Sequence, residues 1–223
     1  MADKGPLLVS IEGPLGVGKS TLVTNISDKF SNMTPLVKVA YIPEDLATWC
    51  NWADEDLLHR AITVGDNIFL FQNVIVFSYK KALREAFSKG YDIVILERSP
   101  VSAINLFSKM ALEDGNLSKG EFQFLSEYAM DIKPPDLMIC LSPDVSQFKC
   151  LNDRVRSRDG DLAVDSWTEK VFFNHSKFLS DPKLGILYPG MELFHINPLL
   201  DPNIVTDQAF TRIMEAFHQR IMG

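Results

Sequence analysis

The strongest constraint on this chain is an apolar run, LLVSIE, followed at once by the loop GPLGVGKS and by a helix-like segment that opens at Thr21. This is the pattern G-x-x-x-x-G-K-S in the strand–loop–helix context that it requires. Glycines let successive backbone N–H groups close around a phosphate, and the helix N-terminus adds positive potential. Lys19 would reach the β- and γ-phosphates, and the Ser20 hydroxyl would bind Mg²⁺. The candidate phosphate-binding residues are Gly13, Gly16, Gly18, Lys19, Ser20 and Thr21.

Further apolar runs along the chain predict the rest of the fold. Runs such as DIVIL and DLMICL are near-continuous, as expected for parallel strands covered by helices on both faces. Longer segments with helical periodicity separate them, which predicts an α/β fold: a P-loop kinase fold with a five-stranded parallel sheet. We expect one domain over residues 1–223, with a lid at about residues 152–165. The predicted strands are 7–12, 37–42, 92–96, 136–141 and 192–196, and the predicted helices after the loop are 66–89, 100–110, 118–131, 145–156, 166–179 and 206–222.

Composition excludes several classes of partner. The net charge of −7 leaves no basic excess to neutralise a nucleic acid. No apolar stretch approaches the roughly 20 residues of a membrane span, and the N-terminus lacks the apolar core of a signal peptide. Three cysteines without metal-ligand spacing fit a reducing compartment, and Cys140 reads as a buried thiol. We therefore expect a soluble, intracellular, cytoplasmic protein without a targeting segment.

Polar side chains follow the predicted strands at the edge where open α/β sheets bind ligands. Glu44 follows the second strand, the pair Glu97-Arg98 ends the third, and Gln72 interrupts the apolar stripe of the longest helix. No D-x-x-G or N-K-x-D loop of a GTPase accompanies them. A basic run follows near the predicted lid: Arg154, Arg156 and Arg158, close to Asp161.

In these stretches the chain resembles the deoxynucleoside kinase family, which includes mitochondrial thymidine kinase, deoxycytidine kinase, insect deoxynucleoside kinase and, more distantly, herpesvirus-type thymidine kinases. The matching segments are IEGPLGVGKST, PEDLATWCN, FLFQ, ERSPVSAINLF and DRVRSRDGD, which occur in family order between residues 7 and 180. The resemblance implies transfer of the γ-phosphate of ATP, with Mg²⁺, to the 5′-hydroxyl of a deoxynucleoside. It also implies a homodimer formed through helices, with segments 66–89 and 100–110 as candidates.

The resemblance assigns roles to the polar residues at the strand ends. Glu44 matches the carboxylate that accepts the 5′-hydroxyl proton, Glu97 the residue that helps hold Mg²⁺, and Arg98 the cation near the 5′ oxygen. The arginines at 154, 156 and 158 match a mobile lid, although this segment is one residue shorter and the third role is unassigned. The plain alternatives are a surface or capping glutamate, a buried Glu–Arg pair and a solvated helix face.

The same resemblance outlines a base pocket. Gln72 would pair with a pyrimidine edge, Phe71 and Phe107 would sandwich the ring, and Trp49 would wall the pocket. Taken alone, the aromatic residues are equally compatible with plain core, and the glutamine with a helix contact. Relatives that prefer cytidine or purines carry an arginine and an aspartate where this chain has Tyr79 and Ala103. Both charges are absent together, which favours thymidine, with deoxycytidine and deoxyuridine as secondary substrates.

One departure concerns the sugar. The family tyrosine that holds the 3′-hydroxyl is Ala61 here, so that selection for deoxyribose is looser or rests on another residue, with His59 as a candidate. Asp161 matches a lid carboxylate, usually glutamate, that also binds this hydroxyl. The adenine of ATP is expected against the loop at residues 197–203.

Two other functions remain open from the sequence. A thymidylate kinase would place an acceptor phosphate beside Glu44, which would repel it, yet herpesvirus-type relatives perform both steps. A non-catalytic nucleotide-binding regulatory module would not need Lys19, Ser20, Glu44 and Glu97 all intact. ATP consumption that depends on an added nucleoside separates the three functions.

Overall fold

The structure is a computed structural model that describes residues 5–33, 37–53, 55–156 and 165–222. Its centre is a five-stranded sheet in the order β2-β3-β1-β4-β5, and every pairing in it is parallel. This confirms the predicted α/β class and the predicted parallel sheet. The strands are β1 (Leu7–Glu12), β2 (Val39–Ile42), β3 (Ile93–Glu97), β4 (Leu137–Leu141) and β5 (Glu192–Ile196).

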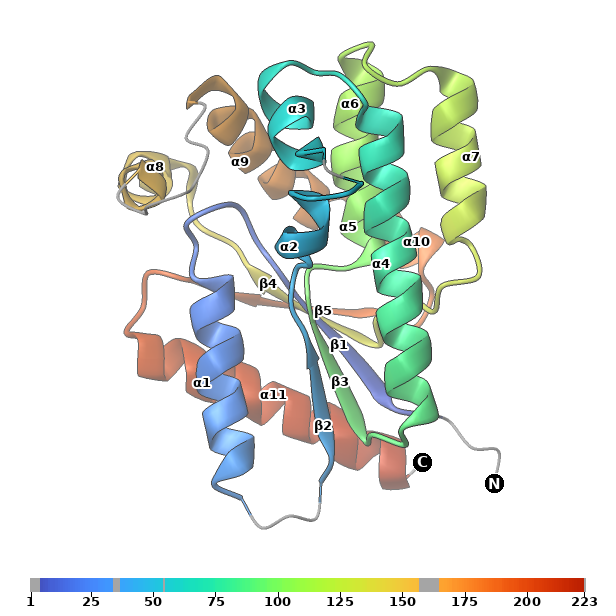
Figure 1. Ribbon diagram of the computed structural model, residues 1–223. Coiled ribbons are helices and arrows are strands. Elements are labelled where there is room, and N and C mark those ends of the chain that lie inside the picture. The colour runs from blue at the N-terminus through green and yellow to red at the C-terminus, as the bar shows by residue number, and fades with distance from the viewer. Residues whose placement is uncertain (1–4, 34–36, 54, 157–164, 223) are drawn as a thin grey trace.

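Helices cover both faces of the sheet, as Figure 1 shows, with α1 and α11 on one side and α4 to α7 on the other. The helices are α1 (Lys19–Ser31), α2 (Leu46–Trp49), α3 (Leu57–Thr63), α4 (Ile68–Ser88), α5 (Pro100–Ser102), α6 (Lys109–Glu113), α7 (Lys119–Ala129), α8 (Phe148–Arg156), α9 (Asp165–Leu179), α10 (Lys183–Leu187) and α11 (Pro202–Met222). A π-helix, η1 (Ala103–Ser108), joins α5 to α6, and a short 3₁₀ helix, η2 (Val145–Gln147), precedes α8. In the described part of the chain, no helix is long and apolar enough to cross a membrane.

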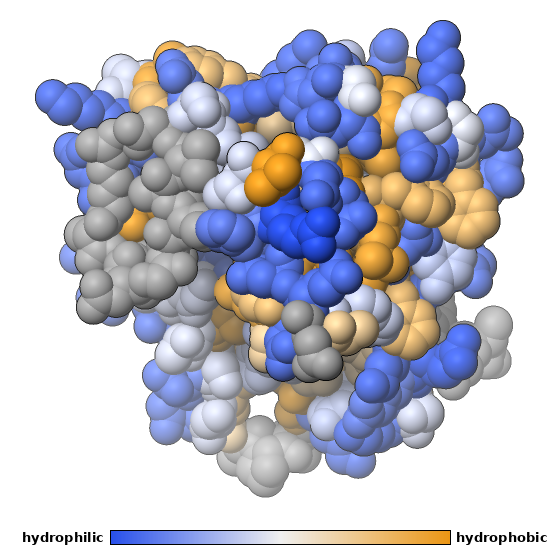
Figure 2. Space-filling model, turned by 45° about the horizontal axis from the view of Figure 1, so that its top comes forward, coloured by the Kyte–Doolittle hydropathy of each residue, from blue (hydrophilic) through white to orange (hydrophobic). Residues whose placement is uncertain are grey.

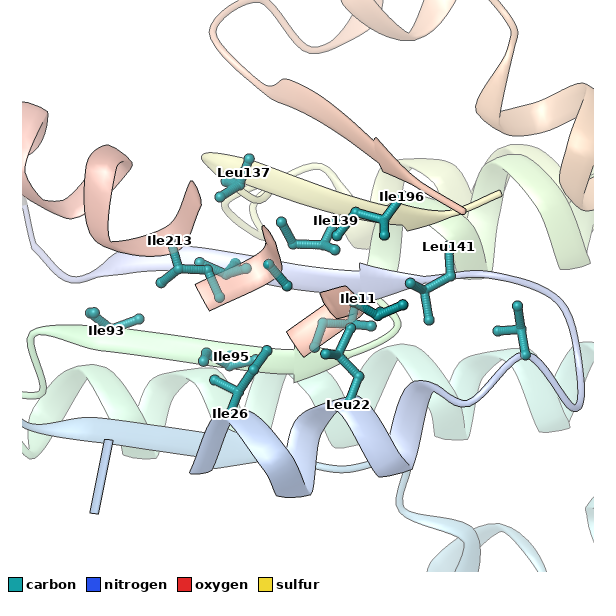
Figure 3. Close-up of a cluster of buried hydrophobic side chains, with 14 of the residues drawn as sticks. Ile11, Leu22, Ile26, Ile93, Ile95, Leu137, Ile139, Leu141, Ile196 and Ile213 are labelled. Atoms are coloured by element: carbon teal, nitrogen blue, oxygen red, sulfur yellow. The ribbon is translucent and has the colours of Figure 1, made fainter. Parts of the chain in front are cut away.

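The largest core cluster lies between the sheet and the helices α1 and α11 (Figure 3). Ile11 on β1 and Ile139 on β4 are fully buried there beside Ile26 of α1 and Ile213 of α11. Truncating one such isoleucine to alanine costs about 2–5 kcal/mol, because the removed methyl groups lose their burial and leave a cavity. This core fixes the position of α1, and therefore of the loop from which α1 begins.

The order of the strands determines where a ligand can bind. β1 lies between β3 and β4: the connection from β1 runs to β2 in one half of the sheet, and the connection from β3 crosses to β4 in the other half. In open α/β sheets the crevice at such a point, at the carboxyl ends of the strands, is the usual ligand site. The loop after β1, Glu44 after β2 and the Glu97-Arg98 pair at the end of β3 all lie at this edge.

Sequence patterns predicted the strands better than the short helices. Leu7–Glu12 and Glu192–Ile196 match the prediction, whereas β2 begins at Val39 rather than at residue 37. The helices α2, α3 and α10 were not predicted, because four to seven residues are too few to show helical periodicity. The segment predicted as one helix over 100–110 continues to Glu113 and contains the π-helix.

Candidate active site

The glycine-rich loop after β1 has the geometry of a phosphate cradle. Gly18 is the N-cap of α1 in the left-handed region, with φ of 97°. A Cβ built on Gly18 meets no atom within 4 Å, so this side of the loop is open. At Gly16, with φ of 72°, a Cβ would lie 2.7 Å from the carbonyl oxygen of Leu151, so that only glycine lets the loop pack against α8.

Lys19 is buried inside this loop. Its Nζ donates a hydrogen bond to the carbonyl oxygen of Pro14 at 3.2 Å. Burial, reinforced by repulsion from Arg98, lowers the pKa of Lys19 to about 8, against attraction from nearby carboxylates such as Glu44 and Glu97. Near pH 8 the Lys19 amine is therefore only partly protonated, and a phosphate bound beside it would raise its pKa again.

The loop is linked to β3 through a hydroxyl and a carboxylate. Ser20 Oγ donates to Glu97 Oε1 at 2.7 Å, and the hydroxyl of Tyr79 donates to the backbone oxygen of Glu97 at 3.0 Å. A serine hydroxyl beside a carboxylate supplies oxygen ligands of the kind that Mg²⁺ binds together with phosphate oxygens. Among the described residues, no three His, Cys, Asp or Glu side chains form a metal site of their own. The donor set therefore fits a metal shared with a bound nucleotide.

Arg98 lies at the centre of the site. Its φ is 62°, rare for a residue with a side chain, and its backbone N–H donates to the oxygen of Ile11 at 3.0 Å. Its Nε forms an ion pair with Glu44 Oε1 at 2.8 Å, and its guanidinium lies 5.0 Å from the centre of the Phe107 ring. The strained backbone turns the side chain from the end of β3 toward Glu44, which joins the two predicted residues.

A second buried carboxylate, which the sequence reasoning missed, lies beneath this pair. Glu12 ends β1, is fully buried, and accepts hydrogen bonds from Ser99 Oγ at 2.7 Å and Ser102 Oγ at 3.1 Å. Burial raises its pKa to about 7, although Arg98, both serines and Lys19 act in the opposite direction. The signal in the sequence was a single charged residue at the end of the apolar run LLVSIE.

A cavity of about 360 Å³ is bordered by Phe107, whose ring lies against Arg98, and contains the predicted base-binding side chains. Gln72, Phe71 and Phe107 all line it, so the structure brings these three together as predicted. Gln72 is buried, and Ser108 Oγ, within the π-helix, donates to its Oε1 at 3.2 Å. The remaining lining residues include Ala61, Ile68, Met110, Asp114, Asn116, Trp167 and Lys170.

Three other residues predicted for the base pocket lie outside this cavity. Trp49, Tyr79 and Ala103 are buried in one apolar cluster with Phe71, and none of them lines the 360 Å³ cavity. Trp49 and Tyr79 border a different pocket, of about 370 Å³, which also contains Glu44. The indole of Trp49 donates to Ser78 Oγ at 3.3 Å and meets the ring of Phe71 edge-on.

The structure describes only some of the residues predicted to contact the sugar or to form the lid. Ala61 lines the cavity, whereas His59 is exposed and does not. Arg154 is exposed on α8, and the side chain of Arg156 at the end of that helix lies outside the described part. Arg158 and Asp161 also lie outside the described residues. The loop predicted to meet adenine connects β5 to α11.

These features define a class of protein. The glycine-rich loop lies at the edge of a parallel sheet where the strand order reverses. It holds a buried lysine, and a serine–carboxylate pair lies beside it. This combination is the site of a P-loop phosphotransferase. The chain belongs to the deoxynucleoside kinase family, because the model of that family matches residues 9–186. It is therefore an enzyme that phosphorylates deoxynucleosides, which confirms the predicted class of enzyme.

Individual relatives are distant. The chain is 27% identical to the probable deoxycytidine kinase of fowlpox virus (strain NVSL) over 181 residues, 78% of this chain and 72% of that protein. It is 29% identical over 122 residues to a putative kinase of invertebrate iridescent virus 3, covering 54% of this chain and 55% of that protein. A structure of deoxyadenosine kinase from M. mycoides with dCMP and dCDP bound has a TM-score of 0.71 at 16% identity, covering 93% of this chain and 99% of that one. The structure of that kinase with dATP has a TM-score of 0.68 at 18% identity, over 92% and 98% of the two chains.

Proposed function

We propose that this kinase transfers the γ-phosphate of ATP to the 5′-hydroxyl of a pyrimidine deoxynucleoside, and that it favours thymidine. The observation that carries the proposal is the Arg98–Glu44 ion pair of 2.8 Å, which holds a carboxylate beside the phosphate loop. The cavity lined by Gln72, Phe71 and Phe107 supports a planar base as the rest of the acceptor.

Glu44 is the proposed general base. It takes the proton of the 5′-hydroxyl as that oxygen attacks the γ-phosphorus, and Arg98 compensates the charge that develops nearby. Lys19 and the N–H groups of the loop meet the phosphates. Mg²⁺ held by Ser20 and Glu97 would supply charge neutralisation at the phosphate oxygens. Positioning and charge account for most of the catalysis in such a reaction, because the protein forms no covalent bond.

The preference for thymidine rests on two uncharged positions. The Tyr79 hydroxyl donates a hydrogen bond to the backbone oxygen of Glu97, and Ala103 lies in the same apolar cluster as Tyr79, so neither position carries the charge that cytidine- and purine-preferring relatives have there. The Gln72 amide can accept from N3–H of thymine and donate to its O4. The relatives carry the names of deoxycytidine and deoxyadenosine kinases, so deoxycytidine is the first competitor to test.

The lid and the dimer complete the proposal. Arg154, Arg156 and Arg158 would close over the transferring phosphoryl group, with Asp161 at the sugar. A second copy of the chain would cover α4 and α7, where Leu70, Phe77, Phe124 and Met130 are exposed, and Figure 2 shows apolar side chains gathered on this side. The segment 100–110, the other interface candidate from the sequence, exposes only Lys109. Sedimentation of the chain and of Phe77→Lys tests the dimer, which the variant should dissociate.

A panel of acceptors tests the function directly. ATP consumption would be measured with thymidine, deoxyuridine, deoxycytidine, deoxyadenosine and thymidine monophosphate as acceptors. We expect kcat/KM to be highest for thymidine and turnover of the monophosphate to be far lower. A higher kcat/KM for deoxycytidine would refute the preference, and efficient use of the monophosphate would favour the thymidylate kinase alternative.

A further inference from the structure

A histidine that the sequence reasoning did not consider contacts the proposed catalytic arginine. His175, on α9, has a relative exposure of 0%, and its Nε2 lies 2.7 Å from Nη1 of Arg98, whose own exposure is 4%. A guanidinium has only donors and does not lose its proton in proteins. Nε2 must therefore be the acceptor, which places the proton of the imidazole on Nδ1 and leaves the ring neutral.

The surroundings hold the ring in this state. Burial, with repulsion from Arg98 and Lys19, keeps the pKa of His175 well below its usual value. Two aromatic rings meet the imidazole edge-on: that of Phe107 from η1 and that of Phe178 from α9 itself. Nδ1 is buried without a hydrogen-bond partner among the described residues. A core position that keeps a polar ring at this cost calls for an explanation, since an apolar side chain would avoid the unpaired N–H.

The explanation lies in how Arg98 is held. Its Nε faces Glu44 and its Nη1 faces His175, so two partners bind different edges of one rigid plane above the Phe107 ring. The third nitrogen, Nη2, takes no part in either of these two contacts. Without the imidazole, Nη1 would be a buried donor lacking an acceptor, and the guanidinium would turn to find one.

We propose that His175 is a positioning residue for phosphoryl transfer: as a neutral acceptor for Nη1, it sets the plane of the Arg98 guanidinium so that Nε holds Glu44 and Nη2 faces the reacting oxygens. This inference rests on the proposed roles of Arg98 and Glu44. His175 itself touches no reacting atom. Helix α9 therefore influences the reaction only through the contact of His175 with Arg98.

Two amide substitutions of different length test whether an acceptor at the position of His175 Nε2 is what Arg98 needs. In His175→Gln the side-chain oxygen can occupy the place of Nε2, whereas in His175→Asn the shorter amide reaches only as far as Nδ1. The Asn variant should lose about 10-fold to 100-fold in kcat, the range typical when the outer partner of a reactive group is removed. Its KM values for ATP and thymidine should change by less than about threefold, since the lost contact acts on the transition state. The Gln variant should restore most of kcat.

A double-mutant cycle separates positioning from general packing. In an Arg98→Ala background, His175→Asn should have no further effect on kcat, because its only route to the reaction has been removed. Additive losses would overturn the inference, as would equal kcat values for the Gln and Asn variants. Loss of the fold in the Gln variant would also overturn it, since packing of the ring would then be what the site requires. If Arg98→Ala alone kept the parental kcat, the proposed function of Arg98 would fail instead, which is a distinguishable result.

Discussion

Glu12→Gln should stabilise the protein at neutral and alkaline pH but not at acid pH. The Gln oxygen can still accept from Ser99 and Ser102, so the substitution mainly removes a buried negative charge. The pKa of Glu12 is raised from its ordinary 4.5 to about 7, with burial as the main cause. A carboxyl with a raised pKa binds its proton more tightly in the folded than in the unfolded state. Folding is therefore favoured below pH 4.5, and this contribution is lost as the pH rises through about 7.

The size of the effect follows from the same shift. A rise from 4.5 to about 7 corresponds to about 3 kcal/mol of unfolding free energy, at 1.36 kcal/mol for each pKa unit. Glutamine stays neutral, so the stability difference between variant and parent should grow by about this amount between pH 5 and pH 8. For a chain of this length the expected increase in Tm is roughly 5 to 10 °C at pH 8.

Urea unfolding at pH 5 and pH 8 measures this difference, with thermal melts as a second readout. The same substitution at the exposed Glu113 is the matched control for loss of a surface charge. A difference between Glu12→Gln and the parent that does not change with pH would refute the reasoning. It would mean that Glu12 is ionised at no energetic cost, held by Arg98 and Lys19.

Three further predictions concern the reaction. Binding of an ATP analogue at pH 8 should take up about half a proton, because the pKa of Lys19 is about 8 and the phosphates would raise it; calorimetry in buffers of different ionisation enthalpy measures this, and Lys19→Ala should abolish both the uptake and turnover. Glu44→Gln should lower kcat far more than thymidine affinity, and turnover within a few-fold of the parent, roughly 1 kcal/mol, would make Glu44 structural. Ala103→Asp combined with Tyr79→Arg should shift the kcat/KM ratio from thymidine toward deoxycytidine, whereas either change alone should destabilise the protein by burying an unpaired charge. An unchanged ratio in a folded double variant would show that neither position influences the base.

The sequence predicted the parts of the site that depend on local pattern. The strand before the glycine-rich loop, the loop itself and the pair Glu97-Arg98 are contiguous segments with specific residue types, and the structure places them at one sheet edge. It also brings Gln72 and Phe107, from two different helices, to one cavity.

The remaining contacts depend on long-range packing that no local pattern records. His175 occupies the same helical face as Val171 and Leu179, so that in the sequence it reads only as a polar residue on an apolar stripe. Its partner Arg98 is 77 residues away. Tyr79 and Ala103 share an apolar cluster, but neither lines the cavity. Tyr79 is on the same face of α4 as Gln72, two turns further along the helix, so its place outside the cavity follows from how the cavity ends and not from a local pattern.

The π-helix η1 makes the shape of the cavity wall depend on chain length. A π-turn holds one residue more than an α-turn, so one residue removed from Ala103–Ser108 would restore regular winding and leave the helix after it in place, whereas the turn itself would narrow. Phe107 and Ser108 belong to this turn, so its winding decides which of its side chains meet Gln72 and the cavity. In this segment, a single insertion or deletion can therefore reshape the binding cavity more than most substitutions, and relatives that differ by one residue here are expected to differ in the bases that they accept.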